Sequence, residues 1–109
     1  MTLEEVKALV HEQAIGNFSA RNDHRITLNQ ALRNPHRISV IARSVRKEHV
    51  AEEYLDVWLV GREEDDDGYK IIMLDDGSRF GLASKGLPVD KYPILVGWYG
   101  SLVSAFLSM

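Results

Sequence analysis

The residues of this sequence that could do acid–base or metal chemistry are first of all its histidines. The chain contains four of them: His11, His24, His36 and His49. They stand at no metal-ligand spacing, and none belongs to a His-Glu-x-x-His pattern. His24, in a polar stretch between an acid and a base, is the candidate general base, although a surface histidine is the commoner outcome. Spacing alone therefore assigns neither a catalytic residue nor a metal ligand.

Two further motifs resemble chemical sites but lack the spacing those sites need. The acidic run at residues 63–67 does not place ligands at alternating positions closed by a glutamate, as a calcium loop requires, so we predict a solvated hairpin loop. Ser101 follows the second glycine of Gly-Trp-Tyr-Gly-Ser, whereas a nucleophile elbow needs Gly-x-Ser-x-Gly. The chain has no cysteine, which excludes disulfides and thiolate metal sites. We predict no cofactor.

Charge is the strongest chemical pattern. Residues 20–50 carry seven basic and two acidic side chains, and residues 51–77 carry ten acidic and two basic ones. The basic segment could bind phosphate, nucleic acid or an acidic protein. It could equally pair with the acidic segment folded beside it, which we favour because the chain has a net charge of −3 and no nucleic-acid-binding motif. Nucleic acid is thus a possible but unfavoured partner.

Five residues are the candidates for contact with a partner, because arginine guanidinium groups and large aromatic rings are common in binding surfaces. They are Arg33, Arg37, Arg43, Trp98 and Tyr99. The two aromatic residues belong to residues 93–109, a stretch of 17 residues without any charge. Glycine and serine interrupt it, so we expect a buried element or a contact with a second copy of the chain, and no membrane span.

The length and composition predict a single domain over residues 1–109. Residues 1–16 hold three glutamates and no basic leader before the apolar positions, which is not the pattern of a secretory signal. We therefore expect a cytoplasmic protein.

Capping residues predict three helices. Thr2 with Glu5 forms a capping box for a helix over residues 3–14, and Thr27 with Gln30 forms one for a helix over residues 28–33. The proline at position 35 ends the second helix, since the residue before proline avoids the α region. Ser101 is a suitable cap for a short final helix up to residue 107.

Apolar alternation predicts the strands. They cover residues 36–46, 54–62, 68–75, 78–83 and 94–99. Residues 47–53 are a connection or a charged early end of the next strand, and residues 94–100 are a strand in preference to the start of a helix. The predicted fold class is α+β, with an antiparallel sheet of four to five strands. The sheet includes a meander at residues 54–83. The three helices are an N-terminal helix, a short second helix and a short C-terminal helix.

The Asp76-Gly77 pair sets the register of this meander. We predict a two-residue type I′ turn there, because both central positions of that turn need positive φ. Counting in twos from the turn puts six residues on one buried face: Trp58, Val60, Ile71, Met73, Phe80 and Leu82. The opposite face is also largely apolar but includes Arg79, so we expect a helix to cover half of it.

The absence of any catalytic spacing favours a small binding or regulatory module that works through protein contacts, as a homodimer or with another protein. One alternative is a small enzyme or ligand-binding domain, in which a curved sheet forms a pocket and His24, Arg43 and Tyr99 converge. A cleft lined by two of those residues would favour it. The other alternative is an acidic inhibitor or immunity-type partner of a basic protein, suggested by the acidic loops.

Overall fold

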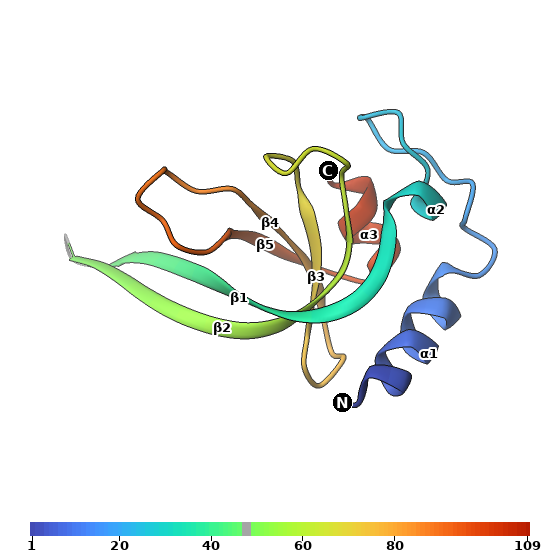
Figure 1. The fold of residues 1–109 in the computed structure, drawn as a ribbon, viewed down its shortest axis with the longest axis horizontal. Coiled ribbons are helices and arrows are strands. Elements are labelled where there is room, and N and C mark those ends of the chain that lie inside the picture. Colours follow the sequence, from blue (N-terminus) through green and yellow to red (C-terminus); the bar gives the residue numbers. More distant parts are fainter. Residues whose placement is uncertain (47–48) are drawn as a thin grey trace.

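The computed structural model describes residues 1–46 and 49–109, and in this part of the chain it contains three helices and five strands (Figure 1). The elements in chain order are α1 (Leu3–Ala14), α2 (Leu28–Ala31), β1 (Leu32–Arg46), β2 (His49–Arg62), β3 (Lys70–Leu74), β4 (Phe80–Ser84), β5 (Ile94–Gly100) and α3 (Leu102–Leu107). The predicted α+β class and its three helices are confirmed.

Each helix begins at its predicted capping residue. The Thr2 and Thr27 hydroxyls accept from the third backbone N–H of their helices, and the Glu5 and Gln30 side chains reach back in complete capping boxes. The Ser101 hydroxyl likewise accepts from a backbone N–H of α3. The second helix is shorter than predicted, because residue 32 already has extended backbone angles and begins β1.

The five strands form a closed barrel in the order of the chain. Sequential neighbours pair antiparallel, and β1 meets β5 in a parallel contact between Ile41 and Ile94. The predicted sheet was purely antiparallel, and this contact corrects it. A meander with an odd number of strands returns its last strand in the direction of the first, so closure must be parallel.

The first two strands are longer than predicted. Residues 47–53 are predicted to be a connection or an early end of the next strand. Residues 49–53 belong to β2, which begins at His49, while Lys47 and Glu48 lie outside the described residues. The pairing of β1 with β2 runs without a register shift from His36–Leu59 to Arg46–His49. This continuous ladder overrides the helical propensity of the charged segment.

The β3–β4 hairpin has the predicted register and a different turn. Met73 faces Phe80, as predicted. Of the central pair only Gly77 has positive φ, at 75°, so the turn is not type I′. The Gly77 N–H donates to the Leu74 carbonyl at 2.8 Å, which makes a longer loop around a type I-like turn with Gly77 in the left-handed region.

The core consists of two clusters on opposite faces of the strands. The first joins the three helices to β2, β3 and β4 and contains all six predicted core residues, so that prediction is confirmed. The second is centred on Val40, Val57, Ile72 and Ala83 and receives side chains from all five strands and from no helix. The expectation that a helix covers half of this face was wrong, because the curled sheet buries the face against its own strands.

The charge-free C-terminal segment contributes to the core within the chain. Leu102, Ala105, Phe106 and Met109 are buried in the first cluster, while Val96 and Leu107 are about half exposed. The surface that suggested a contact with a second copy is therefore largely used within one chain. Among the described residues, no helix is long and apolar enough to cross a membrane.

Candidate protein-binding surface

The most prominent feature of the molecule is a two-stranded arm that projects from the barrel (Figure 1). We define the arm as residues 42–46 of β1 and 49–56 of β2. The contact of β1 with β5 lies at Ile41, and the pairing of β2 with β3 starts at Val57. Within the described ladders, the strand residues of the arm therefore pair only in the ladder of β1 with β2.

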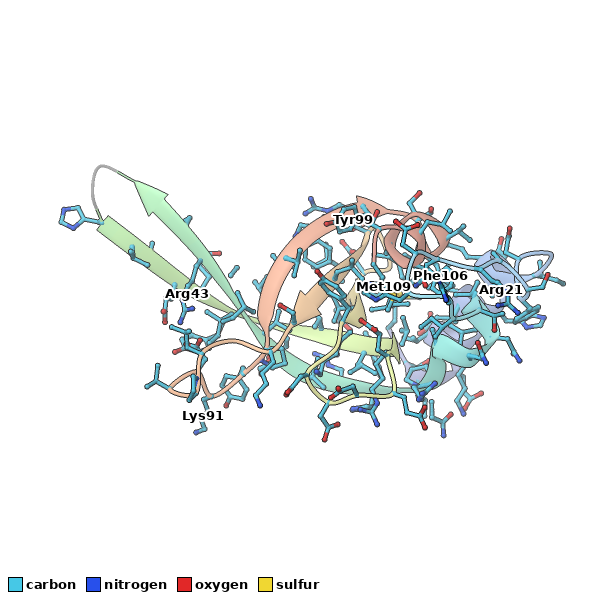
Figure 2. The ribbon with its side chains drawn as sticks, turned by 90° about the horizontal axis from the view of Figure 1, so that it is seen from above. Arg21, Arg43, Lys91, Tyr99, Phe106 and Met109 are labelled. Atoms are coloured by element: carbon cyan, nitrogen blue, oxygen red, sulfur yellow. The ribbon has the colours of Figure 1, made fainter. Side chains whose placement is uncertain are left out.

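The β4–β5 connection lies beside the arm, as both views show (Figures 1 and 2). We call residues 85–93 the arm loop. Arg43 of the arm forms ion pairs with Asp90 of the loop and, at 2.9 Å, with Glu52 of the facing strand. The pKa of Arg43 is raised by its hydrogen bond to Asp90 first and by that to Glu52 second. This arginine therefore ties together two segments that are far apart in the sequence.

Asp90 connects the arm loop to the arm and to the loop's own backbone. Its side chain is only 5% exposed, and its carboxylate also accepts from the Leu87 N–H at 2.6 Å. The hydrogen bond from Arg43 holds the pKa of this carboxyl below its usual value. A Cβ on Gly86 would stand 2.4 Å from an Asp90 carboxylate oxygen, so only glycine fits there. These contacts thus hold the loop against the arm.

An aromatic contact joins the loop to the arm a second time. The ring of Tyr92 meets the ring of Tyr54 edge to face, with centroids 6.0 Å apart. Such pairs add stabilisation beyond their buried area. The ammonium of Lys91 lies 5.8 Å from the Tyr92 ring centroid.

The arm and the arm loop carry the four most exposed large hydrophobic residues of the described chain. Their exposed fractions are 86% for Val89, 65% for Leu87, 64% for Val50 and 63% for Tyr54. Single exposed apolar residues are ordinary, whereas contiguous exposed apolar patches are typical of interaction surfaces. Because these four residues lie on one projecting structure, the arm with the arm loop is the candidate surface. None of these four is among the candidate residues that the sequence indicates. The only signal was apolar residues placed inside short charged or turn-rich stretches.

The predicted partner-binding residues do not gather in one place. Arg43 lies on the arm, as described above. Arg37 lies on the barrel, where it pairs with Asp75 at 2.7 Å and stacks over the Trp58 ring at 5.3 Å. Arg33 donates to the carbonyls of Gln30 and Leu32, so its side chain stabilises the end of α2.

The two predicted aromatic residues belong to the barrel. Trp98 packs on Gly81, where a Cβ would stand 2.7 Å from the ring, and Arg79 stacks over it at 5.2 Å. Tyr99 is half-buried against the first core cluster, well away from Arg43 (Figure 2). Both therefore contribute more to packing than to an open surface.

The candidate general base has a carboxylate partner. His24 Nδ1 lies 3.0 Å from Glu63 Oε2, and its ring stacks on Tyr69 with centroids 5.8 Å apart. The buried Asn22 side chain accepts from the His24 N–H and so fixes the loop. A histidine oriented by a carboxylate can act as a base.

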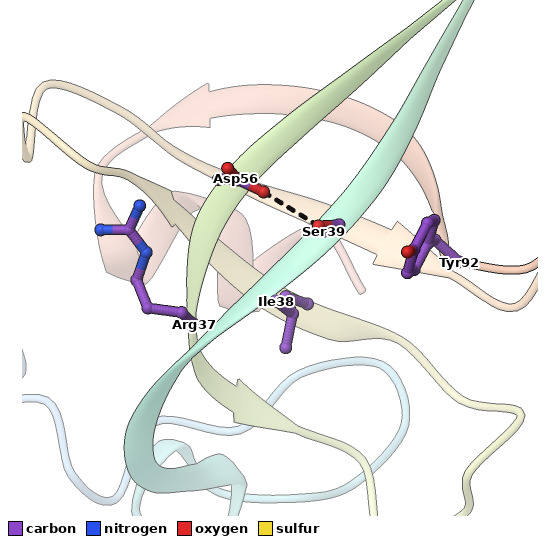
Figure 3. Close-up of a pocket in the computed structure, with 5 residues that line it drawn as sticks. All are labelled: Arg37, Ile38, Ser39, Asp56 and Tyr92. Atoms are coloured by element: carbon purple, nitrogen blue, oxygen red, sulfur yellow. Dashed lines mark hydrogen bonds between the residues drawn. The ribbon is translucent and has the colours of Figure 1, made fainter.

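Three of the open hollows on the described surface are lined by none of the residues His24, Arg43 and Tyr99. One of about 400 Å³ lies at the base of the arm (Figure 3). There the Ser39 hydroxyl donates to Asp56 at 2.9 Å, and no histidine lines the hollow to act as a base. The convergence that would favour an enzyme is not found in these hollows.

The acidic run after β2 is tied to basic neighbours. Asp66 pairs with Arg62, and Asp67 pairs with Lys85, both at 2.8 Å. The described residues contain no group of three or more side chains that could hold a metal ion. Together with Arg37–Asp75 and Arg43–Glu52, these pairs show basic and acidic side chains meeting across the fold.

Comparison with known proteins adds no relative to this description. No protein-family model, no curated protein and no solved structure matches the chain. The functional conclusion therefore rests on the geometry of the arm and the arm loop.

Proposed function

We propose that the protein is a small binding module that contacts another protein through the arm and the arm loop. The observation that carries the proposal is the concentration of Val50, Tyr54, Leu87 and Val89, the four most exposed large hydrophobic residues, on this one projecting structure. Burying such side chains against a partner removes apolar surface from water, at roughly 25 cal/mol for each Å². No catalytic step is part of the proposal.

The anchoring of the loop supports this use of the surface. Binding costs free energy when loops must be ordered at the interface. Here the Arg43–Asp90 ion pair and the Tyr54–Tyr92 contact already hold the loop against the arm. A partner would therefore meet a surface formed in advance.

The partner in this proposal is another protein in the cytoplasm. A homodimer was expected from the charge-free C-terminal segment, but Leu102 and Phe106 of that segment are buried within the chain. Self-association would have to use a different surface, so we do not make it part of the proposed function.

Site-specific photo-crosslinking in cells tests the proposal. A photoreactive amino acid at position 89 should give discrete covalent adducts with a partner. The matched control is the same amino acid at Ile15, which is 60% exposed and lies at the end of α1, away from the arm (Figure 1). The same adducts from both positions, or none from position 89, would contradict the proposal.

A surface variant separates specific binding from random capture. Val50→Asp with Val89→Asp places charges on the exposed apolar side chains and leaves Arg43, Asp90 and the barrel unchanged. In this variant and in the unchanged protein, the photoreactive amino acid replaces Leu87 of the arm loop. Its adducts should be lost in this variant, while Leu107→Asp on α3 should leave them unchanged.

A further inference from the structure

The outer edge of β2 within the arm has unpaired backbone groups. The Ile41 N–H donates to the Pro93 carbonyl at 2.8 Å, so the backbone groups of Ile41 point away from β2. Tyr54, which faces Ile41, must then point its own N–H and carbonyl away from β1. By alternation, Val50 and Glu52 do the same. The structure describes no strand paired to this side of residues 50–54.

A second hydrogen bond confirms this alternation from the other end of the strand. The Leu74 N–H donates to the Arg79 carbonyl, so the backbone N–H and carbonyl of Leu74 point towards β4. Those of its neighbour Met73 therefore point towards β2. Met73 pairs with Trp58, so the backbone N–H and carbonyl of Trp58 point towards β3 and away from β1. Trp58 lies four positions after Tyr54 on one uninterrupted ladder, so the backbone groups of both residues point to the same edge of β2. This edge is paired with β3 at Trp58 and open at Tyr54.

This open edge is acidic. Glu52, Glu53 and Asp56 are all exposed, and no basic residue other than His49 stands on β2 before Arg62. Glu52 is partly neutralised by Arg43, whereas no ion pair is found for Glu53 among the described residues. Acidic side chains on an edge strand oppose pairing with another acidic strand.

A second copy of the chain is a poor occupant of this edge. Antiparallel pairing about a twofold axis centred on Glu52 or on Glu53 places that glutamate opposite itself. Centring the axis on Tyr54 places Glu52 opposite Asp56. Each of these three registers brings like charges together, which is destabilising in directly opposed pairs. Centring the axis on Ala51 avoids this but places the apolar Val50 opposite the Glu52 carboxylate.

We propose that this edge binds an extended basic segment of a partner protein as an added antiparallel strand. The inference rests on the proposed function and specifies its partner. Main-chain hydrogen bonds to Val50, Glu52 and Tyr54 would hold the segment, and its side chains would determine specificity. Adjacent basic residues fit opposite Glu52 and Glu53, and apolar residues fit beside Val50 and Tyr54. The recognised segment is thus a pair of lysines or arginines flanked by β-branched or aromatic residues.

Amide hydrogen exchange measured by NMR tests the mode of binding on the intact protein. The probe is a synthetic peptide with two adjacent lysines between Thr-Val repeats, and the control peptide has two glutamates in their place. The lysine peptide should slow exchange at the amides of Val50, Glu52 and Tyr54. The amides of Ala51 and Glu53 already point to β1 and should change little. Equal effects of both peptides, or no slowing at the three outward amides, would overturn the inference.

Charge reversal gives a second readout. Glu53→Lys should weaken binding of the lysine peptide about threefold to tenfold, since it replaces an attractive cross-strand pair with a repulsive one. The matched control is Glu64→Lys, which makes the same change of net charge on an exposed acid outside the strand. An equal loss in both variants would show an unspecific effect of net charge and overturn the inference.

The outcomes also separate this inference from the proposed function. If position 89 gives specific adducts in cells but the lysine peptide leaves the three outward amides unprotected, the arm binds a partner without strand addition. In that case the further inference fails and the proposed function stands. If the peptide binds the edge and no adducts form from position 89, the arm loop has no part in binding. In that case the proposed function, which includes the loop in the surface, is contradicted, and strand addition at β2 stands.

Discussion

At the scale of single residues, Asp90 is the side chain on which the candidate surface depends most. It joins Arg43 of the arm to the backbone of its own loop, and its carboxylate is almost completely covered. Its folded-state pKa is lowered, first by the hydrogen bond from Arg43. A lowered carboxyl pKa stabilises the folded loop above the unfolded-state pKa of about 3.9, and this contribution is lost as the pH falls through the folded value.

The Leu87 amide should report this titration, because its N–H donates to the Asp90 carboxylate. We expect its NMR chemical shift to stay constant at neutral pH and to change only below about pH 4. Asp90→Asn should remove the change. A midpoint above the ordinary carboxyl range would contradict the assigned role of Arg43.

Gly77 tests the β3–β4 turn at the same scale. Its φ is 75°, and an added Cβ would stand 2.9 Å from a Leu9 methyl of α1. Gly77→Val should lower the free energy of unfolding by about 1 kcal/mol or more, in thermal or urea denaturation. Gly16→Val is the control, since Gly16 has a similar φ and nothing within 4 Å of its added Cβ. Equal losses would mean that packing against α1 contributes nothing.

At the scale of the elements, the strand ladder and the helices share one core. Phe80 of β4 is fully buried in the cluster that α1 and α3 complete. Phe80→Ala should therefore cost about 3 to 5 kcal/mol of stability. The half-exposed Leu107 gives the comparison, and Leu107→Ala should cost much less. A loss below about 1 kcal/mol for Phe80→Ala would contradict its place in the core.

The arm is expected to be dispensable for the barrel. Its strands pair only with each other beyond Ile41 and Val57, and Arg43 faces Glu52 in the ladder. Replacing residues 45–50 by Asn-Gly keeps that pair and joins Ser44 to Ala51, whose backbone groups point to each other as the flanks of a two-residue turn must. We expect a cooperative thermal transition shifted by less than about 5 °C. Loss of cooperativity would show that the arm is part of the folding unit.

At the scale of the whole molecule, the distribution of apolar surface predicts the state of association. The charge-free C-terminal segment packs inside the chain, and the open edge of β2 opposes its own copy by charge. We expect sedimentation at micromolar concentration to give a monomer of 12.3 kDa. A stable dimer would contradict this and would restore the contact between copies that the C-terminal composition suggested.

The sequence by itself determined the features that depend on neighbouring residues. Capping side chains fixed where α1, α2 and α3 begin, because each bonds a backbone group within its own first turn. Period-two alternation fixed which of Trp58, Met73 and Phe80 share a face, because a strand cannot change side without a bulge. Among the candidate functional residues, only Arg43 lies on the arm that we propose as the binding surface.

Tertiary structure alone decided the rest. The parallel closure at Ile41–Ile94 and the pairing of Arg43 with Asp90 join residues about fifty positions apart, and no local pattern encodes such contacts. The turn at Gly77 took its form where α1 packs close against it. The arm exists because β1 and β2 continue past the point where the barrel closes, and strand composition does not reveal where a curled sheet meets itself.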